Sequence, residues 1–397
     1  MNQPVFVIGV GMTKFEKPLR RAWTYPEMVA EAVNAALDDA GVHYDEIGIA
    51  FGGTSLGALA QRSLYTVGTT GVPIMTVTNA CASGSSALYL ARQAVKAGAP
   101  VALAVGWEKM KPGSLGTGVE EDGPGFLDLH LDTMADATGA PLDAHAPPTV
   151  QMFGNAGREH MARYGSTPEH FAWIGWKNHK HSVNNPRSQF QDEYTLEQIA
   201  QARMIWNPLT KLQCSPTSDG AASAIVASER FVEEHDLWDQ AIELAGHHIA
   251  TDAADSFSHK SSIDVVGAQV SRRAAAVALE QAQVSIGDVD VIELHDCFST
   301  NELLTYEALG MAPEGEGHKL VETSDTTYGG RWVVNPSGGL ISKGHPIGAT
   351  GVAQCAELTW QLRGHAGDRQ VPNARIGLQH NIGLGSACAV AIYRRPR

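Results

Sequence analysis

Two segments that lie far apart in the chain are similar to each other without a gap. The first reads ALDDAGVHYDEIGI over 36–49 and the second reads ALEQAQVSIGDVDV over 278–291, a constant offset of 242 residues (278 minus 36). Each copy has the pattern of the end of an amphipathic helix, a short turn and an apolar strand. Because Ala and Leu are common in helices, chance similarity is the alternative. Each copy also follows an Ala-rich helical stretch, EMVAEAVNA or VSRRAAAV, and this favours a true internal repeat.

A looser correspondence extends this repeat. The stretches CASGSSALYLARQAVKAG over 81–98 and GATGVAQCAELTWQLRG over 348–364 both begin with small residues, continue as amphipathic helices and end at Gly. Helices that alternate with strands pack in layers over sheets. We therefore predict an α/β fold of two similar halves, and 397 residues are enough for two such cores.

The segment between the two halves has a different character. Its first part, EEDGPGFLDLHLDTMADATGAPLDAHAPPT, is acidic and rich in turn residues, and its later part reads as helices rich in aromatic residues and cations. We predict an N-terminal half at 1–112, a mostly helical inserted loop domain at 113–248 and a C-terminal half at 249–397. The histidines of the insert lack carboxylate or thiolate partners at metal-ligand spacing. We interpret them as surface or packing residues: His130, His145, His160, His170, His179 and His181.

Charge and cysteine content exclude several classes of partner. A net charge of −14 argues against nucleic acid as the main partner, because a phosphate polymer needs a concentrated positive surface, whereas a small anion needs only a local patch. The five cysteines show no C-x-x-C spacing, and an odd number without a signal peptide favours a reducing compartment. No apolar run is long enough to span a bilayer, and the last residues are not the peroxisomal SKL type. We expect a cytoplasmic protein without membrane insertion.

A cysteine among very small residues is the first candidate for chemistry. Cys81 follows the strand-like run VPIMTVT and opens the helix ASGSSALYLARQAV. A thiol at a helix N-terminus lies at the positive end of the helix dipole, which would lower its pKa, and free N–H groups there could hold an oxyanion. The alternative is that Cys81 is a small core residue, as most buried cysteines are. We interpret Cys214, Cys355 and Cys388 as packing residues.

Two further stretches place reactive side chains in tight turns or at a strand end. SGGLISKGHPIGATG puts His345 among glycine-rich turns, where an imidazole can take the proton of a nearby thiol, although a lone histidine is more often structural. VIELHDCFSTNELL puts His295, Asp296 and Cys297 just past an apolar strand, at the sheet edge where α/β proteins place their sites. A thiol with a pKa tuned toward neutrality, such as Cys297, could act as general acid and base. Alternatively, His295 and Asp296 only cap the following helix.

These stretches together resemble the thiolase superfamily and, within it, the thiolase domain of sterol carrier protein X. Further stretches along essentially the whole chain support the resemblance, namely WEKMKPGSLG, IGWKNHKHSVNNPRSQFQDEY, PTSDGAA and LQHNIGLGSA. The specific element is HDCF, since most thiolases have NEAF there and carry a second catalytic cysteine in a late C-x-G loop. The matching loop here has Asn381 and Gly383 and no cysteine, which agrees with an acid/base role for Cys297.

The resemblance implies a five-layered α-β-α-β-α fold with a helical loop domain, and a tight homodimer. It implies thiolytic cleavage of a 3-oxoacyl-CoA by coenzyme A to acetyl-CoA or propionyl-CoA and a shortened acyl-CoA, in fatty-acid or sterol side-chain degradation. Cys81 would attack the 3-oxo carbon, and Cys297 would move protons. His345 would activate the nucleophile and, with His295, hold the enolate oxygen. Backbone N–H groups at Cys81 and near Gly383 would hold the tetrahedral intermediate. Coenzyme A would be a co-substrate, and no resident cofactor or metal is implied.

Several alternatives stay open. The chain could be a steroid side-chain aldolase, although such relatives lack the nucleophilic cysteine, or it could run the reverse Claisen condensation. It could also be a non-catalytic acyl-CoA- or lipid-binding protein or a scaffold subunit of a complex. Because the chain ends where the X-type protein would continue into a lipid-carrier domain, intermembrane lipid transfer is not expected. The spacing predicts neither the acyl group nor the CoA contacts. For the latter, the segment around Lys177, His179, Lys180 and His181 is a candidate, and a solvated basic face is its alternative.

Overall fold

The computed structural model describes residues 3–111, 125, 127–144, 146–385 and 387–396. Its strands form a ten-stranded mixed sheet in the order β10-β9-β11-β12-β8-β1-β7-β4-β2-β3. The N-terminal part of this order contains β1 (Val5–Met12), β7 (Gly220–Ser228), β4 (Val101–Glu108), β2 (Ile49–Gly53) and β3 (Ile74–Val77). The C-terminal part contains β8 (Ile242–Ala250), β12 (Ala387–Arg394), β11 (Ile376–Gly383), β9 (Val291–Glu293) and β10 (Val333–Val334).

The two parts of the sheet repeat the same topology. From the centre outward, β1-β7-β4-β2-β3 and β8-β12-β11-β9-β10 each pair antiparallel, antiparallel, parallel and parallel. They meet only through a short pairing of β1 with β8, in which Phe6 lies opposite Glu243 and Val7 opposite Ile242. The short 3₁₀ turns Tyr44–Glu46 and Ile286–Asp288 lie at the offset of the sequence repeat. The predicted fold of two similar halves is therefore confirmed.

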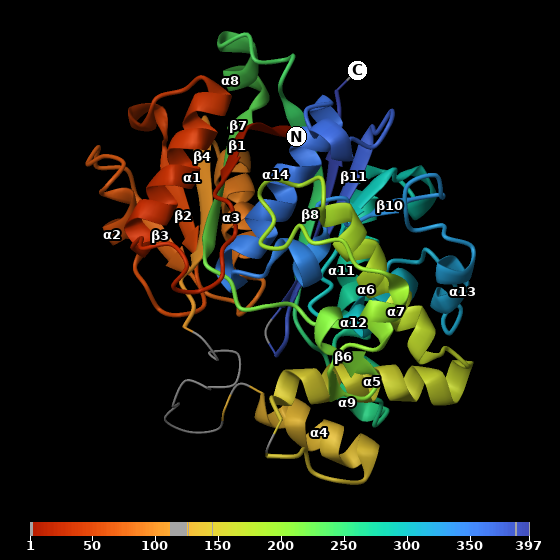
Figure 1. Ribbon diagram of the computed structural model, residues 1–397. Helices are drawn as coiled ribbons and strands as arrows, with labels where there is room; N and C mark the ends of the chain where they lie inside the picture. Colours follow the sequence, from red (N-terminus) through yellow and green to blue (C-terminus); the bar gives the residue numbers. More distant parts are fainter. Residues whose placement is uncertain (1–2, 112–124, 126, 145, 386, 397) are drawn as a thin grey trace.

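Helices form three layers around the two half-sheets (Figure 1). The outer helix α1 (Tyr25–Ala40) packs on β1 and β7, and the outer helix α11 (Ala268–Ala282) packs on β8 and β12. Between the half-sheets, α3 (Ser83–Lys96) and α14 (Thr350–Arg363) contact each other and strands of both halves. This is the predicted five-layered α-β-α-β-α arrangement.

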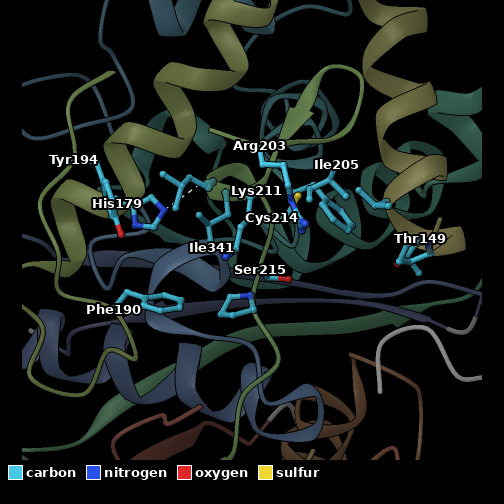
Figure 2. A pocket seen from close by; sticks show the side chains of 15 residues that line it. Thr149, His179, Phe190, Tyr194, Arg203, Ile205, Lys211, Cys214, Ser215 and Ile341 are labelled. Carbon is cyan, nitrogen blue, oxygen red and sulfur yellow. Dashed lines mark hydrogen bonds between the residues drawn. The ribbon is translucent and has the colours of Figure 1, made fainter. Parts of the chain in front are cut away.

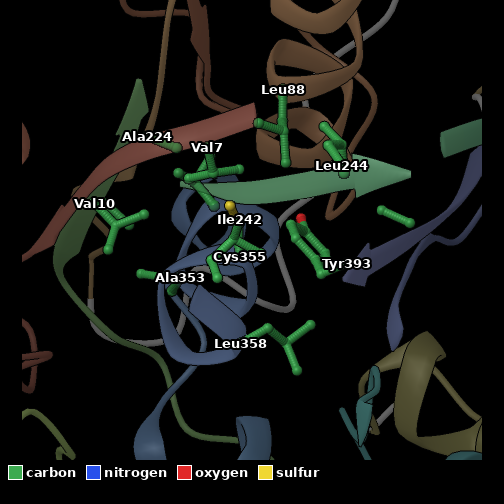
Figure 3. Close-up of a cluster of buried hydrophobic side chains, with 14 of the residues drawn as sticks. Val7, Val10, Leu88, Ala224, Ile242, Leu244, Ala353, Cys355, Leu358 and Tyr393 are labelled. Carbon is green, nitrogen blue, oxygen red and sulfur yellow. The ribbon is translucent and has the colours of Figure 1, made fainter. Parts of the chain in front are cut away.

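The core of the central layer joins the two halves. Leu88 of α3 and Cys355 and Leu358 of α14 pack with Val7 of β1 and Tyr393 of β12, all of them buried (Figure 3). Strands covered on both faces need a continuous apolar sequence, and β4 (VALAVGWE) is buried at every residue. Cys355 is thus a packing residue, as predicted.

The outer helix α1 illustrates how local sequence sets an element. Thr24 and Glu27 form a capping box at its start, and Gly41 ends it in the left-handed conformation with φ of 68°. Its buried residues recur at helical spacing and face β1. The helix lies so close to the strand that a Cβ at Gly9 would meet the Ala36 carbonyl oxygen at 2.4 Å. Gly9 is therefore required by backbone approach.

The segment between the halves leaves the sheet as a group of helices and then returns to it. The excursion contains α4 (Asp128–Thr138), α5 (Pro148–Tyr164), α6 (Pro168–Ser182), α7 (Leu196–Ala200) and the hairpin of β5 (Met204–Trp206) and β6 (Leu209–Thr210). The insert is predicted to end at residue 248, so it would contain all of β7 and most of β8. Because both strands belong to the large sheet, the predicted boundary does not coincide with the end of this excursion. The remaining helices are α2 (Ala60–Leu64), α8 (Glu229–Glu234), α9 (Asp255–Ser258), α10 (Ser262–Val265), α12 (Ser299–Ala308) and α13 (Gly317–Glu322).

The insert histidines are held by hydrogen bonds. His145 lies outside the described residues. The others each have a hydrogen-bonded ring nitrogen: His130, His160, His170, His179 and His181. His160, for example, is buried between Glu307 and Ser166, with ring nitrogen to oxygen distances of 2.8 Å to each. Among the described residues, no helix combines the length and the apolar character that crossing a membrane requires.

Candidate active site

Three of the predicted catalytic side chains come together. The sulfur of Cys81 and one ring nitrogen each of His295 and His345 lie within 4.8 Å of one another. The two imidazoles meet edge to face, with ring centroids 5.2 Å apart and an interplanar angle of 86°. Cys81 follows β3, His295 follows β9 and His345 precedes α14, so the site lies where the two halves of the fold meet.

The turn that carries Cys81 is fixed by its neighbours. Ala80 has a left-handed backbone with φ of 46°, an uncommon conformation for a residue other than glycine. The Ser83 hydroxyl accepts a hydrogen bond from the Asn79 N–H at 2.8 Å and donates to the Ala80 carbonyl at 2.6 Å. These bonds hold the strained turn, and Cys81 remains partly exposed to the site.

The small residues around Cys81 allow backbones to touch. A Cβ at Gly84 would meet the Gly348 carbonyl oxygen at 2.4 Å, and a Cβ at Gly351 would meet the Ser85 hydroxyl oxygen at 2.0 Å. The start of α3, which directly follows Cys81 and Ala82, therefore lies against the segment that follows His345. Larger side chains at these positions would push the nucleophile and the imidazole apart.

The surroundings of His345 fix its orientation and its tautomer. Its backbone N–H donates to the Ser218 hydroxyl at 2.9 Å, and Gly344 before it has φ of 110°. Its Nδ1 lies 2.6 Å from the Thr350 hydroxyl, which itself donates to the Pro346 carbonyl at 3.1 Å. Because that hydroxyl has only one proton, His345 donates from Nδ1. The lone pair of Nε2 is then free to accept a proton.

Burial sets the protonation state of the thiol and of the imidazole. Burial, and next the carboxylate of Glu108, raises the pKa of Cys81 to about 12. Burial, and next the charge of Lys343, lowers the pKa of His345 to about 3. The lowered thiol pKa predicted from the helix N-terminus is therefore wrong, because desolvation outweighs the backbone hydrogen bond that lowers it. The Cys81 thiol and the His345 imidazole are both neutral.

Cys297 is buried and lies outside this group of three, with its sulfur near that of Cys81. Burial, and next the nearby sulfur of Cys81, raises its pKa well above the ordinary thiol value. The pKa tuned toward neutrality that we predicted is not found. A thiol that stays protonated is nevertheless suited to giving a proton to a carbanion.

The alternative role of His295 and Asp296 as helix caps is wrong. The N-cap of α12 is Phe298, and no side chain caps that helix. The Asp296 carboxylate instead accepts hydrogen bonds from the N–H groups of Leu340 and Ile341, at 2.7 and 3.2 Å. It thereby ties the Cys297 segment to the π-helical turn Gly339–Lys343 that leads to His345.

The predicted loop residues differ in what the structure assigns to them. The Asn381 side chain donates from Nδ2 to His295 Nδ1 at 2.9 Å, so this residue belongs to the site through its side chain. Burial, and next His345, lowers the pKa of His295 well below its ordinary value, and its ring is neutral. Gly383 ends β11 opposite Ala387, and its role at an oxyanion stays a prediction.

The basic segment of α6 is not a solvated face. Lys177 is fully buried and donates to Glu302 Oε1 at 2.5 Å, while His179 and His181 are also buried. Lys180 is exposed and lies 4.9 Å from the centre of the Trp176 ring. The alternative of a solvated basic face is wrong, because three of its four members are buried, and a role of this segment in CoA contacts stays a prediction.

A cavity of about 400 Å³ is lined by Phe298, the residue after Cys297, but by none of the four predicted catalytic side chains, and sequence reasoning missed it. Phe298 and Ile341 contribute to its largely apolar wall, and Cys214, predicted as a packing residue, also lines it. Figure 2 shows Arg203 and Lys211 among the lining side chains, and both are exposed. The Ser215 N–H donates to the Cys297 backbone carbonyl at 2.9 Å, which connects the cavity wall to the backbone of the Cys297 segment. No local sequence signal links these residues.

The donor atoms of Cys81, His295 and His345 are also close enough to share one metal ion, and thiolate and imidazole are ligands that Zn²⁺ accepts. The absence of a resident metal stays a prediction. His345 and His295 each use Nδ1 in a hydrogen bond within the protein, which leaves Nε2 of each ring to act in catalysis or to bind a metal ion.

A fold of two similar halves with a cysteine–histidine site between them is typical of acyltransferases that work through a thiol. Residues 5–230 match the thiolase N-terminal domain, and residues 251–395 match the thiolase C-terminal domain-like family. The chain belongs to the thiolase family.

Individual relatives agree with this assignment. The chain is 54% identical over 406 residues to sterol carrier protein 2 of Rattus norvegicus, covering 99% of this chain and 73% of the relative. It is 36% identical over 405 residues to an acetyl-CoA acetyltransferase of Methanothermobacter thermautotrophicus, covering 98% and 99%. A solved Ltp2-ChsH2(DUF35) aldolase matches with a TM-score of 0.82 at 23% identity, covering 100% of this chain and 98% of that one, and this similarity concerns the fold alone.

Proposed function

We propose that the chain is a 3-oxoacyl-CoA thiolase, which cleaves a 3-oxoacyl-CoA with coenzyme A to acetyl-CoA or propionyl-CoA and a shortened acyl-CoA in lipid degradation. The observation that carries the proposal is the convergence of Cys81, His295 and His345 within 4.8 Å, with the Cys297 thiol beside them. A nucleophile, a base, an oxygen-binding donor and a proton donor are the groups that such a cleavage needs.

In the first half of the reaction, the Cys81 sulfur attacks the 3-oxo carbon and its proton passes to Nε2 of His345. The C2–C3 bond then breaks, and its electron pair forms the enolate of the released thioester. His295 donates a hydrogen bond to the enolate oxygen, and the Cys297 thiol protonates C2. The acyl group stays on Cys81 as a thioester.

In the second half, the Cys297 thiolate takes the proton of the incoming CoA thiol. The CoA sulfur attacks the acyl carbon, and the Cys81 sulfur leaves. His345 returns its proton to Cys81, so all groups regain their starting states. Since the free site favours the neutral thiol–imidazole pair, we propose that substrate binding is needed before the Cys81 proton moves.

The cavity lined by Phe298 supports an acyl-CoA substrate. Its volume of about 400 Å³ is in the range of small-molecule sites, and its apolar wall suits an acyl chain. We propose that two exposed cations of its lining, Arg203 and Lys211, bind the phosphate groups of coenzyme A.

We also propose a homodimer in a reducing compartment such as the cytoplasm. Within the described chain, β3 is the last strand of the sheet, so its outer edge has no neighbour. Large apolar side chains are exposed on and near it: Leu56, Leu59, Tyr65 and Met75. An edge strand with such side chains favours pairing with a second copy. All five cysteines are free, which fits a reducing environment.

The proposal is tested by assaying thiolysis of 3-oxoacyl-CoA substrates of several chain lengths, with and without a 2-methyl group. We expect turnover that requires free CoA and is abolished in Cys81→Ala. The matched control is Cys388→Ala. Cys388 is a buried thiol of β12 that donates a hydrogen bond to the Ser271 hydroxyl of α11. Cleavage without CoA would favour the aldolase alternative, and acyl-CoA binding without turnover would favour a binding or scaffold protein.

A further inference from the structure

A chain of four side chains leads from the core to His295. Tyr393 donates to Gln379 Oε1 at 2.5 Å, and Gln379 Nε2 donates to the Ser85 hydroxyl at 2.9 Å. The Ser85 hydroxyl is 2.8 Å from Asn381 Oδ1, and Asn381 Nδ2 is 2.9 Å from His295 Nδ1. All five residues are buried. The first four come from β12, β11 and α3, and His295 follows β9, so the chain joins the two halves of the fold.

One backbone carbonyl fixes the direction of every bond in this chain. Gln379 Nε2 lies 2.8 Å from the carbonyl oxygen of Gly351, which can only accept. The amide nitrogen of Gln379 must therefore be on that side, and it also donates to Ser85. The Ser85 hydroxyl accepts from Gln379 and has one proton, and among the described residues the only acceptor within its reach is Asn381 Oδ1, at 2.8 Å.

The orientation of Asn381 in turn decides the tautomer of His295. With its oxygen toward Ser85, Asn381 presents its NH₂ group to His295 Nδ1. An NH₂ group can only donate, so Nδ1 carries a lone pair and the ring proton of neutral His295 is on Nε2. A flipped Asn381 would instead accept from Nδ1 and move the proton away from the site.

We propose that Asn381, oriented by Ser85 and Gln379, is a positioning residue that keeps neutral His295 in the Nε2–H tautomer, so that this N–H donates to the developing enolate oxygen. The inference rests on the proposed thiolase reaction. The opposite tautomer would present a lone pair to a negatively charged oxygen and would repel it. Removal of one hydrogen-bond donor to a developing oxyanion lowers kcat by about 10²–10³-fold.

Ser85 also lies four residues after the nucleophile Cys81 on the same turn of chain. Cys81 lies two residues before the first residue of α3, and Ser85 in the first turn of that helix orients the donor on His295 through Asn381. This arrangement explains why a serine, and not merely any small residue, stands at position 85 of SGSS.

The test compares Asn381→Leu and Ser85→Ala with the wild type, and Ser223→Ala is the control. Ser223 is a buried serine on β7 that donates to the Ala104 carbonyl at 3.2 Å. For each protein, kcat and KM for thiolysis are measured, together with the rate of Cys81 alkylation by iodoacetamide. Thermal melting curves report whether each variant is folded.

We expect kcat to fall about 10²-fold in Asn381→Leu and about tenfold in Ser85→Ala, with KM and the alkylation rate within about twofold of the wild type. Ser223→Ala should keep full kcat. If Asn381→Leu does not fold, Ser85→Ala decides the matter. Wild-type kcat in a folded Ser85→Ala or Asn381→Leu protein overturns the inference, and so does a parallel fall in alkylation rate, which would indicate a general disturbance. Absence of thiolysis in the wild type would instead refute the proposed function.

Discussion

Replacing Gly84 by alanine tests whether the small residues beside Cys81 serve close backbone approach. The added Cβ would lie 2.4 Å from the Gly348 carbonyl oxygen, whereas ordinary contacts begin at 3.4 Å. The start of α3 and the segment after His345 must then separate by about 1 Å. Alanine is favoured over glycine inside a helix by about 1 kcal/mol, and overpacking costs about 1–3 kcal/mol. We therefore expect a net loss of stability of at most about 2 kcal/mol.

The effect on catalysis should be larger than the effect on folding. A displacement of 1 Å between reacting groups can lower the rate by about 10²-fold, so we predict a fall in kcat/KM of about 10- to 100-fold in Gly84→Ala. The assay is thiolysis of acetoacetyl-CoA, with urea denaturation as the measure of stability. The matched control is Gly287→Ala, where the nearest contact of the new Cβ is 3.4 Å, to Ser285. Wild-type kcat/KM in folded Gly84→Ala would refute the reasoning.

Three further perturbations test other features. Lys177→Met should destabilise the protein by about 3–5 kcal/mol in urea denaturation, because it leaves the Glu302 carboxylate buried without its cationic partner. The control Lys180→Met should change the free energy of unfolding by less than about 0.5 kcal/mol. Equal effects of the two substitutions would contradict the buried pair. The pKa of Cys81 is raised to about 12, so its thiolate fraction rises about tenfold for each pH unit below that value. The rate of Cys81 alkylation by iodoacetamide should therefore rise about tenfold per pH unit between about pH 7 and 10. A rate that reaches a plateau near neutral pH would indicate a thiolate–imidazolium pair instead. Met75→Asp on β3 should yield monomers in light scattering, and an unchanged dimer would contradict the proposed interface.

The architecture could be predicted because its signals are local. The repeat at 36–49 and 278–291 corresponds to the end of an outer helix, a 3₁₀ turn and the start of a strand in each half, and the offset of 242 residues (278 minus 36) is the same for all three. Boundaries were harder to predict. β7 reads as an apolar run inside the segment assigned to the insert, and only its pairing with β1 and β4 places it in the sheet.

The members of the site could be predicted, but not their electrostatics. Cys81, His295 and His345 each stand out by residue type and by small or strand-end surroundings. The raised pKa of Cys81 depends on burial and on Glu108, which arrives from another strand. The bond between Ser85 and Asn381 joins residues 296 positions apart, and nothing in the sequence near either residue indicates it. Lys177 likewise looks like part of a basic surface until its partner Glu302 is known.

The central claim is that the Cys81 sulfur carries the acyl group. The most direct measurement is mass spectrometry of proteolytic peptides after brief reaction of the protein with a 3-oxoacyl-CoA and acid quenching. We expect one acyl group on the peptide that contains Cys81, and its loss when free CoA is added before quenching. An acyl group on Cys297, or turnover without any acylated peptide, would contradict it.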